Sequence, residues 1–153
     1  MADSNANNIE MQYPSVLFYE CKDVIRIFYD EDNGLIIHEW LDYNPEGQDS
    51  LIIEVLQKIY EIFLDTSARK VLVKADQTRG VFSLGVNKYI REIQFPRLID
   101  DTELKFVATI INKNDMNSRY AEIWKGHLKQ NAPLILHDVS SEAEGRAWLK
   151  QFD

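Results

Sequence analysis

The sequence contains a single cysteine, Cys21, and three histidines, so several classes of site have little to be built from. One cysteine excludes an internal disulfide, and without a CxxC neighbour we expect it to be an incidental thiol in a reducing compartment. His38, His127 and His137 fall in separate predicted elements with no ligand spacing such as HxxxH, whereas a zinc site needs about three to four ligands. We therefore expect no metal, no cofactor and no catalytic centre, so the protein is not predicted to be an enzyme.

Long apolar runs and basic patches are missing as well. No stretch approaches the roughly 20 apolar residues that cross a bilayer, and the opening residues, MADSNANNIE, lack the basic and apolar segments of a secretory signal. The chain has 17 basic against 25 acidic side chains and a net charge of −8. Duplex nucleic acid and anionic membranes are bound through basic patches, so neither is expected as the main partner. We expect a cytoplasmic protein without membrane insertion.

What the sequence does have is enough apolar material for one core. Hydrophobic residues make up 45% of the 153 positions, which is sufficient for a single domain without disulfide or metal support. Residues 1–12 are rich in Asn, Asp, Ser and Ala and are expected to form a disordered tail. Residues 13–153 are predicted to form the domain.

The hydrophobic pattern predicts six strands and four helices. The strands are Val16–Glu20, Val24–Tyr29, Leu35–Trp40, Val71–Lys74, Phe106–Ile111 and Leu134–Leu136. The helices are Gly47–Asp65, Leu84–Gln94, Met116–Gln130 and a last one that opens with the capping box Ser141 to Glu144. Asn33-Gly34 supplies a tight turn, and Pro96 is expected to end the second helix at Phe95. This order predicts an α/β fold: a mixed, mostly parallel sheet of five to six strands with an antiparallel N-terminal hairpin and about four helices packed against it.

Three polar loops are expected to gather at the carboxyl edge of the parallel strands. They contain the candidate anion-binding or ligand-binding residues Asp76, Thr78, Arg79, Lys113 and His137. Cationic side chains beside helix N-termini can hold a phosphorylated metabolite or nucleotide. The alternative is that these loops are polar only because they lie on the surface, since none is a glycine-rich phosphate cradle.

Two local patterns resemble the STAS domains, and in particular the SpoIIAA-like branch that is often described together with lipid-binding domains. The first is the strand Val71–Lys74 running through GVFSLG, residues 80–85, into a helix, and the second is EAEGRAWL, residues 142–149. The resemblance implies a SpoIIAA/STAS-like fold, and a phospho-acceptor at Ser83 for a partner kinase. The chain departs from the family pattern at Phe82, where the family has Asp, and at Leu84, which follows the serine. Only Ser83 is therefore carried over.

The sequence allows two interpretations of Ser83. A serine at a helix start is commonly an N-cap, whose hydroxyl accepts from a backbone amide of the first turn. The resemblance instead implies a regulatory, non-catalytic interaction module of bacterial-type regulation, switched by phosphorylation of Ser83. Its protein partner, a regulator or a kinase, would dock on Leu84, Val86 and Tyr89, and a homodimer is compatible with this interpretation. The alternative function is a carrier for a small molecule, a lipid or an anionic metabolite, which would need a sizeable apolar cavity.

Overall fold

The computed structural model describes residues 15–42, 44–77, 82–111 and 134–152. In these ranges the strands form one six-stranded sheet in the order β1-β2-β3-β4-β5-β6, so each strand lies beside its neighbours in sequence. The strands are β1 (Val16–Cys21), β2 (Ile25–Asp30), β3 (Leu35–Trp40), β4 (Lys70–Lys74), β5 (Phe106–Ile110) and β6 (Ile135–Val139). β1, β2 and β3 pair antiparallel, and β3 to β6 pair parallel. The predicted mixed α/β sheet with an antiparallel N-terminal hairpin is confirmed.

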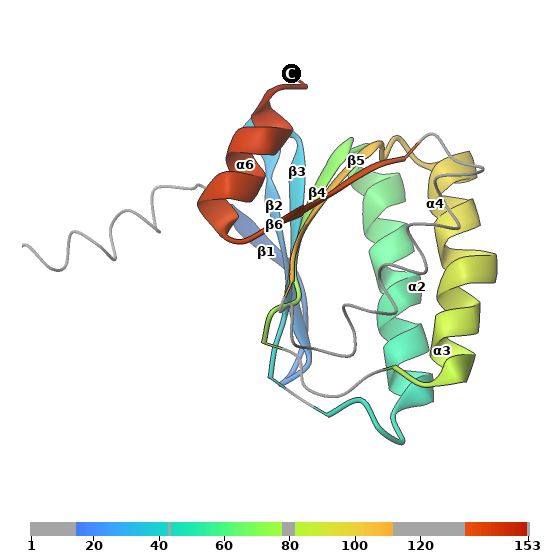
Figure 1. Ribbon diagram of the computed structural model, residues 1–153. Coiled ribbons are helices and arrows are strands. Elements are labelled where there is room, and N and C mark those ends of the chain that lie inside the picture. The colour runs from blue at the N-terminus through green and yellow to red at the C-terminus, as the bar shows by residue number, and fades with distance from the viewer. Residues whose placement is uncertain (1–14, 43, 78–81, 112–133, 153) are drawn as a thin grey trace, which may run out of the picture.

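Two layers of helices cover the two faces of this sheet (Figure 1). On one face lie α2 (Asp49–Thr66) and a second helical rod made of α3 (Leu84–Tyr89), η2 (Ile90–Gln94) and α4 (Phe95–Asp101). On the other face lies α6 (Glu142–Lys150). Parallel neighbours joined by right-handed crossovers place the connecting helices on one side, which explains why α2 and the rod share a face. We call the face under α2 and the rod the two-helix face, and the other the α6 face.

Gly34 supplies the tight turn between β2 and β3, as predicted. Residues Glu31–Asn33 form a short 3₁₀ turn, η1, and Gly34 ends it with φ 59° and ψ 39°. The buried Asp30 carboxylate caps this turn, accepting from the backbone N–H of Asn33 at 3.3 Å and from its side-chain amide at 2.9 Å. Glycine adopts positive φ without the steric penalty of a Cβ. The turn therefore sets the register in which Asp30 pairs with Leu35.

The helix that begins at Leu84 does not end before Pro96, so that prediction was wrong. The rod continues to Asp101, and its middle segment, η2, is a π-helical turn in which the N–H of Phe95 donates to the carbonyl of Ile90. Proline lacks an N–H, and its ring clashes with the carbonyl four residues earlier in an ordinary α-helix. The wider π turn lies immediately before Pro96 and accommodates the proline by changing the hydrogen-bond spacing. Propensity alone could not predict this solution.

The sheet separates two apolar cores. The core of the two-helix face contains buried side chains from β2, β3, β4, α2 and the rod, among them Ile27, Ile36, Ile52, Phe63 and Val86. The core of the α6 face is smaller and contains Leu35, Ile37, Leu72, Phe106, Ala108, Ile110, Val139 and Leu149. Alternation along a strand sends successive side chains to opposite faces, as Leu35, Ile36 and Ile37 do in β3. Both cores are therefore specified by the same strands.

β6 is longer at its carboxyl end than the sequence indicated. It extends from Ile135 to Val139, so His137 and Asp138, which were predicted to lie in a loop, are paired with Ala108 and Thr109 of β5. Pairing with β5 extends the strand beyond its short apolar run.

Two other predictions lie outside the described residues: the tail at 1–12 and the helix at 116–130. None of the helices in the described ranges is both long and apolar enough to span a membrane.

Candidate functional site

Ser83 is held at the start of the rod by hydrogen bonds in two directions. Its backbone is extended, with φ −64° and ψ 166°, and its Oγ accepts from the N–H of Val86 at 3.1 Å. The same hydroxyl donates to Oδ2 of Asp49, the first residue of α2, at 2.7 Å. The predicted N-cap is confirmed. Because one hydroxyl serves both contacts, it also ties the beginning of the rod to the beginning of α2.

Further contacts fix the backbone around this serine. The side-chain amide of Asn87 donates to the carbonyls of Phe82 and Ser83, both at 3.0 Å. The Phe82 ring meets Trp40 of β3 edge to face, with ring centroids 5.8 Å apart. Asn87 is only 4% exposed, so a buried polar side chain holds the backbone at the start of the rod. Backbone freedom at Ser83 is small as a result.

The three residues predicted to dock a partner do not form one surface. Leu84 is 78% exposed, whereas Val86 is 1% exposed and belongs to the core of the two-helix face. Tyr89 is partly buried, and its hydroxyl is buried without a hydrogen-bond partner in the described part of the chain. On a helix, residues two positions apart point in different directions, which separates Leu84 from Val86. Leu84 is therefore accessible to a partner and Tyr89 only in part, while the prediction that Val86 docks a partner was wrong because Val86 is buried in the core.

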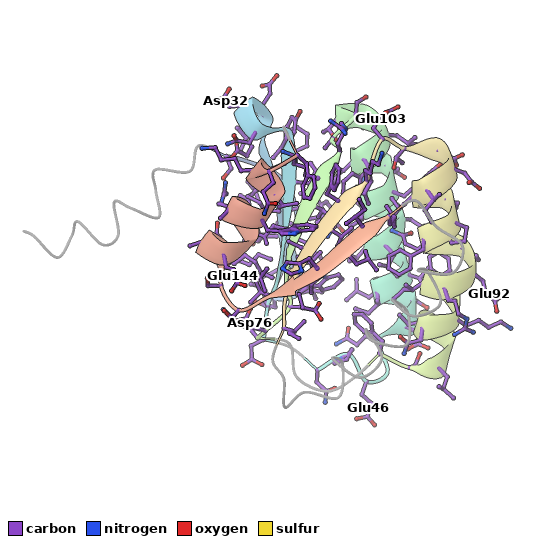
Figure 2. The ribbon with its side chains drawn as sticks, turned by 45° about the horizontal axis from the view of Figure 1, so that its top comes forward. Asp32, Glu46, Asp76, Glu92, Glu103 and Glu144 are labelled. Atoms are coloured by element: carbon purple, nitrogen blue, oxygen red, sulfur yellow. The ribbon has the colours of Figure 1, made fainter. Side chains whose placement is uncertain are left out.

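The candidate ligand residues are not brought together where the structure describes them. Asp76 is exposed in a bend after β4, and its side chain points away from the sheet (Figure 2). His137 lies within β6 on the α6 face, where its ring stacks on Trp148 of α6 with centroids 4.8 Å apart. The expected position of His137 in a loop at the strand ends was therefore wrong. Thr78, Arg79 and Lys113 lie outside the described residues, so their part in an anion site stays a prediction.

Sequence reasoning missed a chain of six alternating charges on the α6 face. It begins with Arg26 Nε, which lies 3.1 Å from Glu39 Oε1, while Glu39 Oε2 lies 3.7 Å from Lys74 Nζ. Lys74 Nζ is also 3.1 Å from Glu142 Oε1. We call these four residues, together with Arg146 and Asp30, the ion-pair chain. Its first three members come from β2, β3 and β4 in turn, so it crosses the sheet from strand to strand.

The second half of the ion-pair chain returns through α6 to the sheet. Arg146 bridges two carboxylates, with Nε 3.0 Å from Glu142 Oε2 and Nη1 3.1 Å from Asp30 Oδ2. Asp30 is fully buried and Arg146 is 11% exposed at its side chain, so this end of the chain is shielded from water. Burial alone would raise the pKa of the Glu142 carboxyl, but the hydrogen bonds from Arg146 and Lys74 outweigh burial and lower it. The Glu142 carboxylate is therefore stabilised as the anion.

The sequence did carry a signal for this arrangement. Arg26, Glu39 and Lys74 are charged residues within strongly apolar strands, and Glu142 and Arg146 stand four residues apart on one helix face. A charge inside a buried strand needs a partner. Which partners meet depends on the register of the sheet and the direction of α6, and neither could be read from the sequence.

His38 is a buried polar side chain on the two-helix face. Its ring lies edge-on to Phe63 of α2 with centroids 5.8 Å apart, and its paired neighbours on β2 and β4 are the apolar Ile27 and Val73. Burial lowers the pKa of His38 from 6.5 to about 3, so the ring is neutral at physiological pH. Its Nε2 has no hydrogen-bond partner among the described residues. A neutral, enclosed imidazole of this kind is unsuited to proton transfer with a substrate.

The described ranges contain no group of three or more His, Cys, Asp or Glu side chains positioned to hold a metal ion. In the comparisons with known proteins, no family model, curated protein or solved structure matches this chain. The similarity to STAS domains thus stays a hypothesis that depends on residues 80–85 and 142–149 and on the element order.

Proposed function

We propose that this protein is a non-catalytic, STAS-like regulatory module that acts in the cytoplasm and docks a protein partner through the surface at Ser83 and Leu84. The observation that supports this proposal is the exposure of Leu84, which at 78% exceeds that of every other large apolar side chain in the described ranges. Leu84 follows a serine that is hydrogen-bonded on two sides. A partner that buries this leucine gains apolar contact without having to order the backbone beneath it.

Phosphorylation of Ser83 by a partner kinase would act directly on this surface. When the γ-phosphoryl group of ATP is transferred to Oγ, ADP leaves, and a base of the kinase takes the hydroxyl proton that Ser83 now donates to Asp49, 2.7 Å away. The phosphate adds roughly 1.5 to 2 negative charges beside the Asp49 carboxylate. Repulsion between the two groups would weaken the tie between the beginnings of α2 and the rod. The hydrogen bond from Ser83 to Asp49 therefore supports the docking surface, and phosphorylation of Ser83 would remove it.

The docking proposal is tested by a matched pair of leucine variants. The wild-type chain, Leu84→Ser and Leu64→Ser are used as baits in the cells from which the protein comes, and co-purifying proteins are quantified by mass spectrometry. Leu64, on α2, is 44% exposed and serves as the control. We expect a specific partner to be lost with Leu84→Ser and retained with Leu64→Ser. Equal recovery with all three baits would exclude Leu84 as the docking residue.

The switch is tested separately with Ser83→Asp and Ser83→Asn. Asp and Asn are equally good N-caps, so the two variants differ mainly in charge at a position close to Asp49. We expect Ser83→Asp to lose the partner and Ser83→Asn to keep it, and we expect phosphopeptide analysis of the native protein to find phosphate on Ser83. If the two variants bind alike and no phosphate is found, the surface docks its partner without this switch.

The second candidate function is a carrier of a small lipid or anionic metabolite. Three side chains beneath the helices favour it: His38, Asn87 and Gln94 are 3–6% exposed, and each has a polar atom without a partner in the described ranges. Buried polar atoms normally have a hydrogen-bond partner, and a bound ligand could supply one. Native mass spectrometry of the protein purified from its own cells should then reveal a bound mass that denaturation releases. The absence of such a mass would leave the interaction module as the better proposal.

A further inference from the structure

In the part of the chain that the structure describes, the helix on the α6 face is the short α6, and two kinds of contact hold it in place. α6 contains nine residues, of which only Gly145 and Leu149 are buried. A helix of this length is not stable by itself in water, so its conformation depends on contact with the sheet. We infer that α6 is a latch, which opens as a unit while the remainder of the sheet stays folded, and whose closure is controlled by the ion-pair chain at Lys74.

The first contact is a close approach at Gly145. A Cβ atom at this position would lie 2.6 Å from Cδ1 of Leu72 and 3.3 Å from Cγ2 of Val139. Leu72 is fully buried in the middle of β4, so it cannot move aside easily. The helix backbone therefore fits against the sheet in one position, and small displacements lose the contact. This geometry favours two states, seated and released, over a continuous range.

The second contact is the ion-pair chain, which attaches α6 to two strands, through Glu142 to β4 and through Arg146 to β2. Lys74 holds Glu142 at 3.1 Å, and Asp30 holds Arg146 at 3.1 Å. The side chains of Lys74 and Glu142 are 26% and 31% exposed, so water can replace their contact when the helix leaves. Opening the two-helix face would instead expose many apolar side chains at once. Release of α6 thus costs less free energy than release of α2.

The latch shields a defined strip of the sheet. Gly145 lies over Leu72 and Ala108, and the ring of Phe152, after the helix, stacks on Phe106 with centroids 4.1 Å apart. When α6 opens, these apolar side chains of β4 and β5 become accessible. Figure 2 shows Glu144 of α6 and Glu92 of η2 on opposite sides of the sheet, so this strip lies on the face opposite the rod that begins after Ser83. The inference does not depend on the proposed function.

Hydrogen–deuterium exchange of the full chain tests the latch, with Lys74→Met and Lys58→Met as a matched pair. Lys74→Met removes an ammonium group that pairs with Glu39 and with Glu142 of α6, whereas Lys58→Met removes one that pairs with Glu61 within α2. A charged hydrogen bond contributes enough for its loss to speed opening about tenfold. We expect the amides of α6 to exchange about tenfold faster in Lys74→Met, with α2 and β4 unchanged, and no such effect in Lys58→Met.

Gly145→Ala provides an independent route to the same state. The added methyl group meets Leu72, while alanine raises helix propensity, so faster exchange could not be attributed to a weaker helix. Gly145→Ala should also release α6 while the other elements stay protected. The inference is overturned if Lys74→Met and Lys58→Met affect α6 equally. It is equally overturned if α2 and β4 lose protection together with α6 in Gly145→Ala, because α6 would then open only when the whole domain unfolds.

Discussion

The two faces of the sheet are held by different physics. Among the described residues, eighteen buried apolar side chains form the core of the two-helix face, and eight form the core of the α6 face. The α6 face also has the ion-pair chain of six charged residues. Apolar burial is non-directional and scales with area. Ion pairs require particular atoms at particular distances. The first face is therefore stabilised by the amount of surface it covers, and the second by the precision with which one helix fits.

The largest effect should come from the centre of the two-helix face. Phe63 is 1% exposed, and its replacement in Phe63→Ala should lower the free energy of unfolding by about 3–5 kcal/mol. Leu64 is the next residue on α2 but is 44% exposed, so Leu64→Ala should cost less than about 1 kcal/mol. Urea denaturation of both variants measures the difference. Similar losses would mean that this face does not depend on its buried area.

A somewhat smaller effect should follow from breaking the ion-pair chain at its buried end. Arg146→Met leaves the fully buried Asp30 carboxylate without its cation and should cost about 3 kcal/mol. The double variant Asp30→Asn with Arg146→Met removes both charges and should recover most of that loss. If the double variant is as unstable as the single one, the α6 face is stabilised by packing of the arginine stem and not by charge.

Replacing the buried His38 on the two-helix face should change the stability in the opposite direction. His38→Leu removes a buried nitrogen that has no partner in the described ranges and should raise the free energy of unfolding by about 1–2 kcal/mol at neutral pH. The pH dependence follows from the lowered pKa of His38. Above the unfolded pKa of 6.5 the ring is neutral in both the folded and the unfolded protein. As the pH falls from 6.5 toward about 3, the unfolded chain binds a proton that the folded protein does not, so the free energy of unfolding falls.

The variant isolates this pH dependence because the leucine side chain does not titrate. Between about pH 7 and about pH 5 the wild type should lose about 2 kcal/mol more than His38→Leu. Parallel urea titrations at the two pH values measure this. Equal losses in the two proteins would show that His38 gains a hydrogen-bond partner when it is protonated.

The smallest effect is expected at the beginning of the rod. Ser83→Ala removes the cap to Val86 and the hydrogen bond to Asp49 and should cost about 1 kcal/mol. Ser83→Asn keeps a capping side chain and should cost less. Thermal unfolding monitored by circular dichroism distinguishes the two variants. A larger loss would indicate that the link between α2 and the rod contributes more to the two-helix face than the cap itself does.

Features with a short sequence range were predicted well. The six buried residues of α2 recur at helical spacing, and Ser141 caps α6 by accepting from the N–H of Glu144 at 3.1 Å. The other half of that capping box differs, because the Glu144 carboxylate accepts from the N–H of Ser140 at 3.1 Å and not from that of Ser141. The candidate site was predicted only in part. Ser83 was found as a cap, whereas its partner Asp49, 34 residues earlier in the chain, was not.

The sequence by itself determined the class of the sheet and most of the described strands and helices, though not every end, because strand and helix periodicities are local patterns that each segment carries alone. Only the tertiary structure decided that Leu84 is exposed while Val86 is buried, that a π turn accommodates Pro96, and that Lys74 meets Glu142. Each of these outcomes depends on the register between strands and on the direction in which a helix crosses them. Residues separated by dozens of positions in the chain meet only when those two quantities are fixed.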